Sequence, residues 1–336
     1  MRFGIVPAHG PQYVYEAIEQ VKMCDRLGID SVWIEEHHAG GSYWPTPLLG
    51  LASLIPFTEH VLFGTDILVL PLHDPVHIAE QFAVLDIMSR GRMILAAALG
   101  DNQDEFAMFR VKATKRGNAF EEQIKIIRAL WTGEPLFFNG EVYQYNGIRL
   151  PVLPVQKNGI PIWIGGWGPR QLERAAKLGN AWMPGPVGDL KGVLERQITY
   201  KQLLRDGGED PLLRQQPLTR DFLVANSEEE AWELAEKEVL PAYQHDYIQS
   251  DHPLVGIESG AHFTNPRELA RDRLIIGDPE SVSREAIRCI RLTQTDHLIF
   301  RLKLPGISPQ IISQMITLLG KEVIPAIKAE LALNKQ

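Results

Sequence analysis

Long apolar runs and clusters of positive charge are both missing from this 336-residue sequence. Its longest strongly apolar run, Met93–Leu99, is far shorter than the roughly 20 residues that cross a bilayer, so we expect no membrane segment. Lys and Arg number 34 against 42 Asp and Glu, a formal net charge of −8, and no Lys/Arg-rich run occurs. We therefore expect no nucleic-acid partner. Residues 1–7 lack the apolar stretch and cleavage site of a signal peptide, which predicts a cytoplasmic protein.

Cysteine is scarce, and several signatures of catalysis are absent. The two cysteines, Cys24 and Cys289, lie in stretches that we interpret as helix, and we expect buried thiols rather than a disulfide. No G-x-S-x-G sequence occurs and no cysteine lies near a histidine motif, so covalent acyl transfer has no nucleophile. The absence of a Walker A loop, and of G-x-G-x-x-G after the first apolar run, argues against nucleoside-triphosphate and Rossmann-type binding.

Short apolar runs alternate with longer amphipathic segments along the chain. Each run has the length and the flanking turn residues of a β-strand. The eight runs are Phe3–Pro7, Ser31–Glu35, Val61–Leu70, Met93–Leu99, Pro161–Gly165, Ala181–Met183, Arg220–Ala225 and His297–Leu302. Such alternation predicts an α/β fold with a parallel sheet and crossover helices.

Two architectures fit this alternation, an open doubly wound sheet and a closed (β/α)8 barrel, the TIM barrel. The even count of eight runs and the absence of a midchain linker favour the barrel. We therefore expect one barrel domain over residues 1–336 with two insertions. Residues 136–154 are typical of a hairpin with an Asn-Gly turn. Residues 247–272 show neither a helical nor a strand period, and we interpret them as a lid.

Helices between the runs begin with recognisable signals. Asp74-Pro75, Asp278-Pro279 and Ser308-Pro309 each place a capping side chain directly before a proline, as at the start of a helix. Apolar residues then recur at helical spacing in the first of these helices, and we expect them on its buried face. They are Val76, Ala79, Phe82, Ala83 and Ile87.

Two carboxylates and two imidazoles follow the second run, at Glu35, Glu36, His37 and His38. Catalytic residues of α/β barrels lie at the carboxyl ends of strands, and these side chains suit proton transfer. Successive strand residues face opposite sides, so one histidine at most enters a given site. We favour a catalytic histidine over the two alternatives, a structural role and a metal site. We predict no metal, because no second cluster has ligand spacing.

A glycine-rich turn links the fifth run to the next helix through Gly165, Gly166, Trp167 and Gly168. Glycines before a helix N-terminus let the backbone approach an anion, which predicts a phosphate cradle. Arg301 ends the last run on the same rim, where it either adds a contact to the phosphate or is a solvated charge.

Three acidic residues and one amide also follow the fourth run. The acids are Asp101, Asp104 and Glu105, and the amide is Asn102. We expect helix capping and solvated side chains here rather than catalytic groups.

Several spaced blocks, in order and over nearly the whole chain, resemble the bacterial-luciferase-like flavin monooxygenases. Agreement of neighbouring blocks between Val61 and Arg92 makes the resemblance specific. The blocks are Leu27–His38, Phe63–Pro71, His73–Pro75 with Ala79-Glu80, Leu85–Arg92, Leu130–Gly133, Pro161–Gly166 and Ile276–Glu280. The resemblance implies a barrel with an insertion over the active site. It also implies reduced FMN supplied by a separate reductase, or a deazaflavin coenzyme.

Individual roles are implied by the same resemblance. His37 is the first histidine of Glu-His-His, the catalytic residue in luciferase. A non-prolyl cis peptide that backs the flavin ring falls between Asp66 and Ile67. Ala98 and Leu99 stand where luciferase has a reactive cysteine and a phosphate-binding arginine. This departure argues against light emission and places more of the phosphate binding on backbone N–H groups.

We therefore interpret the chain as a flavin-dependent monooxygenase that uses reduced FMN and O2 to oxidise a small organic substrate. Its expected partners are a transient flavin reductase and further copies of itself, in a homodimer or higher oligomer. The alternatives are a deazaflavin-dependent dehydrogenase, which transfers hydride, and a flavin-binding subunit without catalysis. The residues predicted to bind the cofactor are Asp66, Ile67, Leu99, Gly165, Gly166, Trp167, Gly168 and Arg301.

Overall fold

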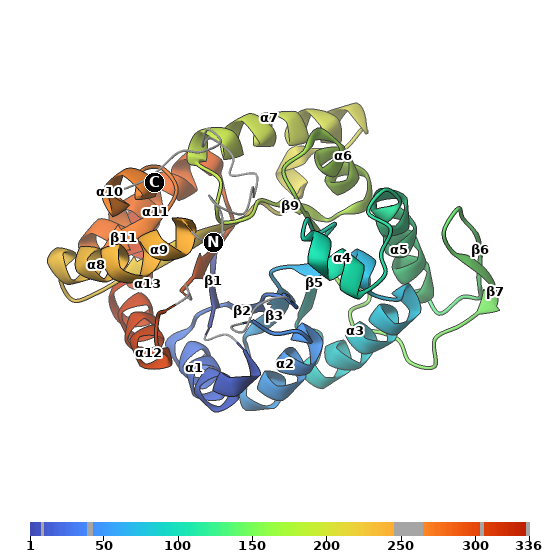
Figure 1. Cartoon of the computed structure of the whole chain (residues 1–336), viewed down its shortest axis with the longest axis horizontal. Coiled ribbons are helices and arrows are strands. Elements are labelled where there is room, and N and C mark those ends of the chain that lie inside the picture. The colour runs from blue at the N-terminus through green and yellow to red at the C-terminus, as the bar shows by residue number, and fades with distance from the viewer. Residues whose placement is uncertain (8–9, 39–42, 245–264, 303–305, 334–336) are drawn as a thin grey trace.

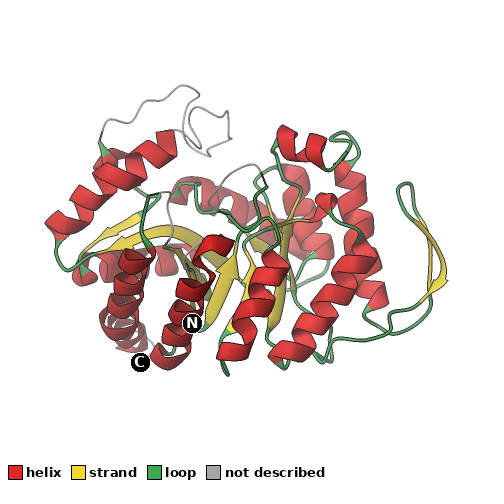
Figure 2. Cartoon of the chain, turned by 60° about the horizontal axis from the view of Figure 1, so that its bottom comes forward, coloured by secondary structure: helices red, strands yellow, loops and turns green. Residues whose placement is uncertain are grey.

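The computed structural model describes residues 1–7, 10–38, 43–244, 265–302 and 306–333. In this part of the chain, parallel strands form a large sheet that curls on itself, with helices outside it (Figure 1 and Figure 2). The strands of this sheet are β1 (Arg2–Val6), β2 (Ser31–Ile34), β3 (Leu62–Thr65), β4 (Leu68–Val69), β5 (Met93–Ala98), β8 (Ile162–Gly165), β9 (Ala181–Met183), β10 (Pro217–Val224), β11 (Ile275–Gly277) and β12 (His297–Arg301).

The order of the strands confirms the α/β barrel class. It runs β11-β10-β12-β1-β2-β3-β5-β8-β9, with β4 paired to β5. All of the pairings in this sheet are parallel, so the carboxyl ends of the strands meet at one rim. β9 and β10 lie side by side, but among the described residues no strand pairing joins them. The curled sheet therefore has a seam at that point.

Helices follow most strands and cover the outside of the sheet. They are α1 (Val14–Leu27), α2 (Pro47–Leu54), α3 (Pro75–Ser89), α4 (Gln103–Met108), α5 (Arg116–Leu130), α6 (Pro169–Leu178), α7 (Leu190–Asp206), α8 (Glu228–Leu234), α9 (Leu240–Tyr243), α10 (Pro266–Ala270), α11 (Pro279–Thr293), α12 (Pro309–Leu318) and α13 (Ile324–Leu333). Single turns of 3₁₀ helix occur at η1 (Pro11–Tyr13), η2 (Ile55–Phe57), η3 (Leu70–Leu72) and η4 (Pro211–Leu213), and of π helix at η5 (Ala235–Val239) and η7 (Leu319–Val323).

The three helix starts read from the sequence are confirmed. Asp74 accepts hydrogen bonds from the backbone N–H groups of the first turn of α3, and Asp278 and Ser308 do so in α11 and α12. The expected buried face of α3 is wrong at one position, because Ile87 is 44% exposed. A helix that is apolar nearly all round has no single buried face that the spacing can identify.

Tryptophans fill the interior of the barrel. The indoles of Trp33 on β2 and Trp163 on β8 stack with ring centroids 4.9 Å apart, and His297 packs edge-on against both. A Cβ on Gly64 of β3 would lie 2.2 Å from the Trp33 ring, so glycine is required to admit the indole. The larger part of the core lies between the sheet and the helices.

The first predicted insertion is a hairpin, formed by β6 (Leu136–Asn139) and β7 (Gln144–Ile148). It stands beyond α5 at the edge of the molecule (Figure 1 and Figure 2). The expected Asn-Gly turn is wrong, because Asn139 pairs with Gln144 and four residues connect the strands. Glu122 of α5 accepts hydrogen bonds from three backbone N–H groups of this connection, which fixes its shape.

The second predicted insertion, 247–272, falls largely outside the described residues. Its last part contains the short helix α10, where we expected no regular structure. Asn265 caps this helix by accepting a hydrogen bond from the N–H of Arg267, a local signal that the sequence analysis missed. The interpretation as a lid stays a prediction.

Cys24 and Cys289 are both buried and free, as expected. Within the described residues no helix has the length and apolar character needed to cross a membrane.

Candidate active site

The carboxyl ends of the strands bring most of the predicted site residues to one rim, which we call the barrel mouth. His37 follows β2, Asp66 and Ile67 follow β3, Leu99 follows β5, Gly165 ends β8 and Arg301 ends β12. We expected the chemistry at this rim, and the parallel topology brings these residues to it.

A non-prolyl cis peptide joins Asp66 and Ile67, which confirms the bond implied by the resemblance. Ile67 lies directly against the end of β8. A Cβ on Gly165 would be 2.4 Å from Cδ1 of Ile67 and 3.5 Å from the Cβ of Ala98. Any side chain at position 165 would displace Ile67, so glycine allows these segments to form one continuous wall of the mouth.

The glycine turn after β8 ends at an open helix terminus. The carbonyls of Gly165 and Gly166 accept hydrogen bonds from Gln171 (3.1 Å) and Trp182 (2.8 Å). Gly168 is the N-cap of α6, provides no capping side chain, and a Cβ there would meet no heavy atom within 4 Å. Pro169 has no N–H, and the N–H groups of Gln171 and Leu172 donate to the Gly168 carbonyl. The start of α6 can therefore offer an anion the N–H of Arg170 and the positive end of the helix dipole.

Trp167 forms one side of this turn, and a cation accompanies it. Its ring packs edge-on against Trp182, with centroids 5.9 Å apart. The guanidinium carbon of Arg196 on α7 lies 5.6 Å from the centroid of the Trp167 ring, and Arg196 Nε donates to the Trp167 carbonyl at 2.9 Å. Arg196 was not among the predicted residues. It lies in the middle of α7, in a stretch without a motif and far in sequence from the glycine turn.

Arg301 is paired within the protein, a contact that we did not expect. It is buried, and its guanidinium donates to two carboxylates, Asp221 through Nε and Nη2 and Glu35 through Nη1 at 3.2 Å. The expectation of a solvated charge is wrong, because Arg301 is the counter-ion of buried carboxylates. A contact between Arg301 and the phosphate stays a prediction.

Asp66 is a third carboxylate in the mouth. Its Oδ2 accepts a hydrogen bond from Oγ1 of Thr219 at 3.2 Å. Burial and the nearby charge of Glu35 raise the pKa of Asp66 to about 7, although Arg301 opposes the shift. The Asp66 carboxyl group can therefore hold a proton near neutral pH.

His37 lies at the mouth with 49% of its side chain exposed. Its Nδ1 is 3.7 Å from Oε1 of Glu105, and its ring packs edge-on against Tyr43 at 4.4 Å. Partial desolvation by its neighbours opposes protonation, but the carboxylates of Glu105 and Glu35 outweigh it and raise the pKa of His37. An exposed imidazole held by a carboxylate at one nitrogen is suited to proton transfer at the other.

Glu105 is a functional candidate that the sequence analysis assigned to solvent. Asn102 does cap α4 and Asp104 is exposed, as expected. Glu105, however, is only 3% exposed, and its Oε1 also accepts the backbone N–H of His38 at 2.8 Å. Capping residues and buried acids look alike in the sequence. The available signal was its place in the segment that follows β5, at the carboxyl end of a barrel strand.

Glu36 and His38 point away from His37, as strand alternation requires. Glu36 is buried, and its carboxylate contacts both His38 Nε2 (3.0 Å) and His73 Nε2 (2.7 Å). Burial works against ionisation, but these imidazoles and a backbone N–H lower the pKa of Glu36. No group of His, Cys, Asp or Glu among the described residues has the arrangement of a metal site.

Leu99 is half-buried and packs against the main core, so it can contribute only apolar surface to the mouth.

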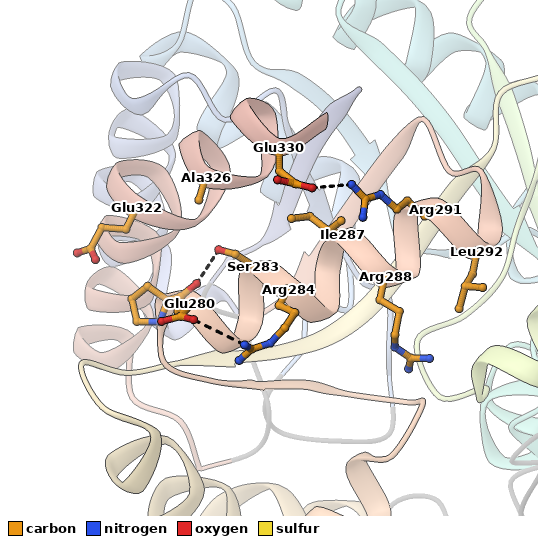
Figure 3. Close-up of a pocket in the computed structure, with 11 residues that line it drawn as sticks. Glu280, Ser283, Arg284, Ile287, Arg288, Arg291, Leu292, Glu322, Ala326 and Glu330 are labelled. Carbon is orange, nitrogen blue, oxygen red and sulfur yellow. Dashed lines mark hydrogen bonds and ion pairs between the residues drawn. The ribbon is translucent and has the colours of Figure 1, made fainter. Parts of the chain in front are cut away.

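A large surface groove lies elsewhere, between α11 and α13, with a volume of about 910 Å³ (Figure 3). Two ion pairs lie along it: Arg284 with Glu280 at 3.6 Å and Arg291 with Glu330 at 2.8 Å. Between them the floor is formed by apolar residues such as Ile287 and Ala326. Ion pairs on an outer helical layer give this groove no group suited to catalysis.

Comparison with known proteins gives a family match and several relatives. A family model described as luciferase-like monooxygenase matches residues 1–295. One relative is the oxygenase component of a flavin-dependent trigonelline monooxygenase from Acinetobacter baylyi. It is 29% identical over 279 residues, which cover 80% of this chain and 77% of the relative.

Another relative is an F420-dependent glucose-6-phosphate dehydrogenase from Nakamurella multipartita. It is 26% identical over 342 residues, which cover 98% of this chain and 97% of the relative. Among solved structures, the oxygenating constituent of 3,6-diketocamphane monooxygenase from Pseudomonas putida, in complex with FMN, is similar with a TM-score of 0.79. Its identity is 19%, with 97% of this chain and 98% of that one covered, so this likeness shows the fold.

Proposed function

The chain belongs to the luciferase-like monooxygenase family, and from this premise we propose that it is a flavin-dependent monooxygenase. It would use reduced FMN, delivered by a separate reductase, and O2 to oxidise a small organic substrate. The observation that carries the proposal is one barrel mouth with an open glycine turn, the Asp66–Ile67 wall and the His37–Glu105 pair. The relative that acts on trigonelline is an oxygenase component, which agrees with a separate reductase.

The residues of the mouth fit a flavin mononucleotide. The phosphate would bind at Gly166–Gly168, where α6 begins without a capping side chain, with Arg196 as the nearby cation. Gly165 keeps a space that a Cβ would fill, beside Ile67. The isoalloxazine ring would rest on the wall formed by Asp66 and Ile67, and Leu99 and Trp167 would add apolar surface.

The cofactor would supply the electrons that activate O2, and the chain would position the reactants and move protons. Glu105 stabilises the protonated form of His37 from Nδ1, which leaves Nε2 to give or accept a proton. Asp66 can hold a second proton at its carboxyl group, near the hydroxyl of Thr219. Ile67, Ala98 and Leu99 are apolar and would help to exclude water from the reaction.

A deazaflavin-dependent dehydrogenase is the second candidate. It is favoured by the F420-dependent relative that aligns with 98% of this chain. The same His37–Glu105 pair would then take or give the proton that accompanies hydride transfer.

One experiment separates the candidates. The protein is titrated anaerobically with reduced FMN and with reduced F420, and each complex is then assayed with and without O2. We expect tighter binding of reduced FMN and product only when O2 is present. Turnover without O2 on F420 would support the dehydrogenase. Binding without turnover of any substrate tried would favour a non-catalytic flavin-binding subunit.

A further inference from the structure

One buried carboxylate lies behind the catalytic pair, on the outer side of the barrel mouth. Glu36 directly follows Glu35, but the two point in opposite directions: Glu35 reaches Arg301 inside the mouth, whereas Glu36 reaches His38 and His73 outside it. Glu36 is 1% exposed. A carboxylate without access to water is stable only if hydrogen-bond donors surround it.

Three donors from three separate segments meet this carboxylate. The backbone N–H of Val69, in β4, donates to Oε2 at 2.6 Å. His73, directly before the cap of α3, is 2.7 Å from Oε1, and His38, after β2, is 3.0 Å from the same oxygen. The carbonyl of His73 is itself held by Gln123 at 2.7 Å. Glu36 therefore joins the ends of β2 and β4 to the start of α3.

Each of these contacts leads to a part of the candidate site. Glu36 holds the side chain of His38, whose backbone N–H donates to Glu105 at 2.8 Å. Glu105 in turn lies 3.7 Å from His37. Through Val69, it holds β4, which begins directly after the Asp66–Ile67 peptide and pairs with β5 at Ala97 and Ala98.

We propose that Glu36 is a positioning residue: it fixes, from outside the barrel, both the His37–Glu105 pair and the wall formed by Asp66 and Ile67. The proposal concerns the site of the proposed function and rests on that function for its kinetic consequence alone. Glu36 does not face the mouth, so its effect on the reaction passes through the groups that it holds.

Because three donors meet the Glu36 carboxylate, the substitution Glu36→Gln tests its role directly. A carboxylate accepts with both oxygens, whereas an amide accepts with one and donates with the other atom. In Glu36→Gln, the amide nitrogen would face either the Val69 N–H, where the hydrogen bond is lost, or the two imidazoles, which would have to change tautomer to accept from it. Glu36→Asp keeps the charge but shortens the reach by one methylene, and it separates loss of charge from loss of position.

Glu122 provides a matched control. It is another nearly buried carboxylate, with 9% exposure, that accepts backbone N–H groups, but it holds the β6–β7 hairpin away from the mouth. Glu122→Gln should therefore lower the melting temperature without affecting the site.

The experiment has two readouts. In the cofactor-free protein, the titration of His37 is followed by NMR, with His37→Ala used for assignment. In the holoenzyme, kcat and KM are measured. We expect Glu36→Gln and Glu36→Asp to lower the pKa of His37 and to reduce kcat about 10- to 100-fold, the usual cost of small misplacement, while Glu122→Gln changes neither.

The proposal is overturned if Glu36→Gln matches Glu122→Gln, with a lower melting temperature but an unchanged His37 titration and kcat. It is also overturned if Glu36→Asp behaves as the parent protein, because charge alone would then suffice. Because the NMR titration needs no cofactor, it tests the positioning even if the parent protein shows no turnover, an outcome that would count against the proposed function instead.

Discussion

His37 is exposed at the mouth, whereas Glu105, whose carboxylate favours its protonated form, is buried. If this imidazole transfers the proton of the reaction, His37→Ala should leave the fold and cofactor affinity intact and lower kcat about 10²- to 10⁴-fold, the usual contribution of a positioned acid or base. The measurements are steady-state turnover and cofactor titration.

His38→Ala is the matched variant, because His38 points to the outside of the barrel. We expect a much smaller loss of turnover from it, caused only by relaxation around Glu36. A dispensable His37 beside an essential His38 would reverse the assignment of the catalytic histidine.

Glu105 should set the pH range of the reaction. Its carboxylate favours protonated His37, so the pKa of His37 is raised and its charged form persists to higher pH. In Glu105→Gln this support is lost, and we expect the pKa of His37 and the corresponding limb of the kcat/KM profile to move to lower pH. Asp104→Asn, an exposed neighbour, should leave the profile in place; a profile that is unchanged in both variants would contradict the pairing.

Asp66 should make the protein less stable as the pH rises. An aspartate in an unfolded chain titrates near pH 3.9, whereas burial and the charge of Glu35 raise the pKa of Asp66 to about 7 in the folded state. Between these values the folded state binds more protons than the unfolded state, so the free energy of unfolding falls with rising pH.

Asp66→Asn removes this titration. Compared with the parent, we expect the variant to lose less stability between pH 5 and pH 8 in urea unfolding, and Asp206→Asn, at an exposed position on α7, to behave as the parent. Equal losses in all three proteins would show that Asp66 does not titrate in this range.

At the scale of single residues, the sequence could predict features that depend on neighbours in the chain, but not those that depend on tertiary packing. Strand alternation separates His37 from His38 without any tertiary information. The burial of Glu105 depends on how α4 packs beneath the mouth, which no neighbouring residue reports. The pairing of Arg301 with Asp221 and Glu35 joins three strands that are distant in sequence, so no local pattern indicates it.

Helix α6 is the element on which phosphate binding should depend. Gly166 has a φ of +119° and Gln171 packed against it, so replacing it would strain the turn as well as alter its charge. Gly168 lies in open space with an ordinary φ of −76°. In Gly168→Asp, the carboxylate can cap α6 and would also repel a phosphate.

We expect Gly168→Asp to weaken binding of reduced FMN about tenfold or more, while the melting temperature stays the same or rises. Gly168→Ala adds no charge and should bind nearly as the parent does. If the aspartate variant and the parent have equal dissociation constants, the phosphate does not bind at this terminus.

Elements with strong local signals were predictable, as was the three-residue strand β9, but strand β11 was not. The capped starts of α3, α11 and α12 depend on residues adjacent in sequence. Strand β11 has three residues and exists because β10 is long enough to pair with it beyond the end of β12. The pairing of β11 with β10 is a tertiary property, which the residues of β11 do not indicate by themselves.

At the scale of the whole molecule, α3 leaves apolar surface uncovered. Val84, Ile87 and Met88 are spaced so that they share one face of the helix, and each is 44–45% exposed. A contiguous apolar face is typical of an interface, and we expect the protein to form the predicted homodimer or higher oligomer through it.

Light scattering after size exclusion tests this. The parent should exceed the monomer mass of 37.8 kDa, and Ile87→Glu should shift it toward the monomer. Leu212→Glu, at an 84% exposed position on η4, should not. A parent that is monomeric over the whole concentration range would refute the interface.

The paired indoles of Trp33 and Trp163 also give the barrel an optical property. Two chromophores stacked at 4.9 Å couple their electronic transitions, so the folded interior should contribute a strong near-ultraviolet circular dichroism signal. That signal requires β2 and β8 to be held at their native separation across the barrel, and it would vanish if the sheet uncurled while its helices persisted. A bound flavin absorbs where tryptophan emits, so quenching of the emission would report cofactor binding without any added label.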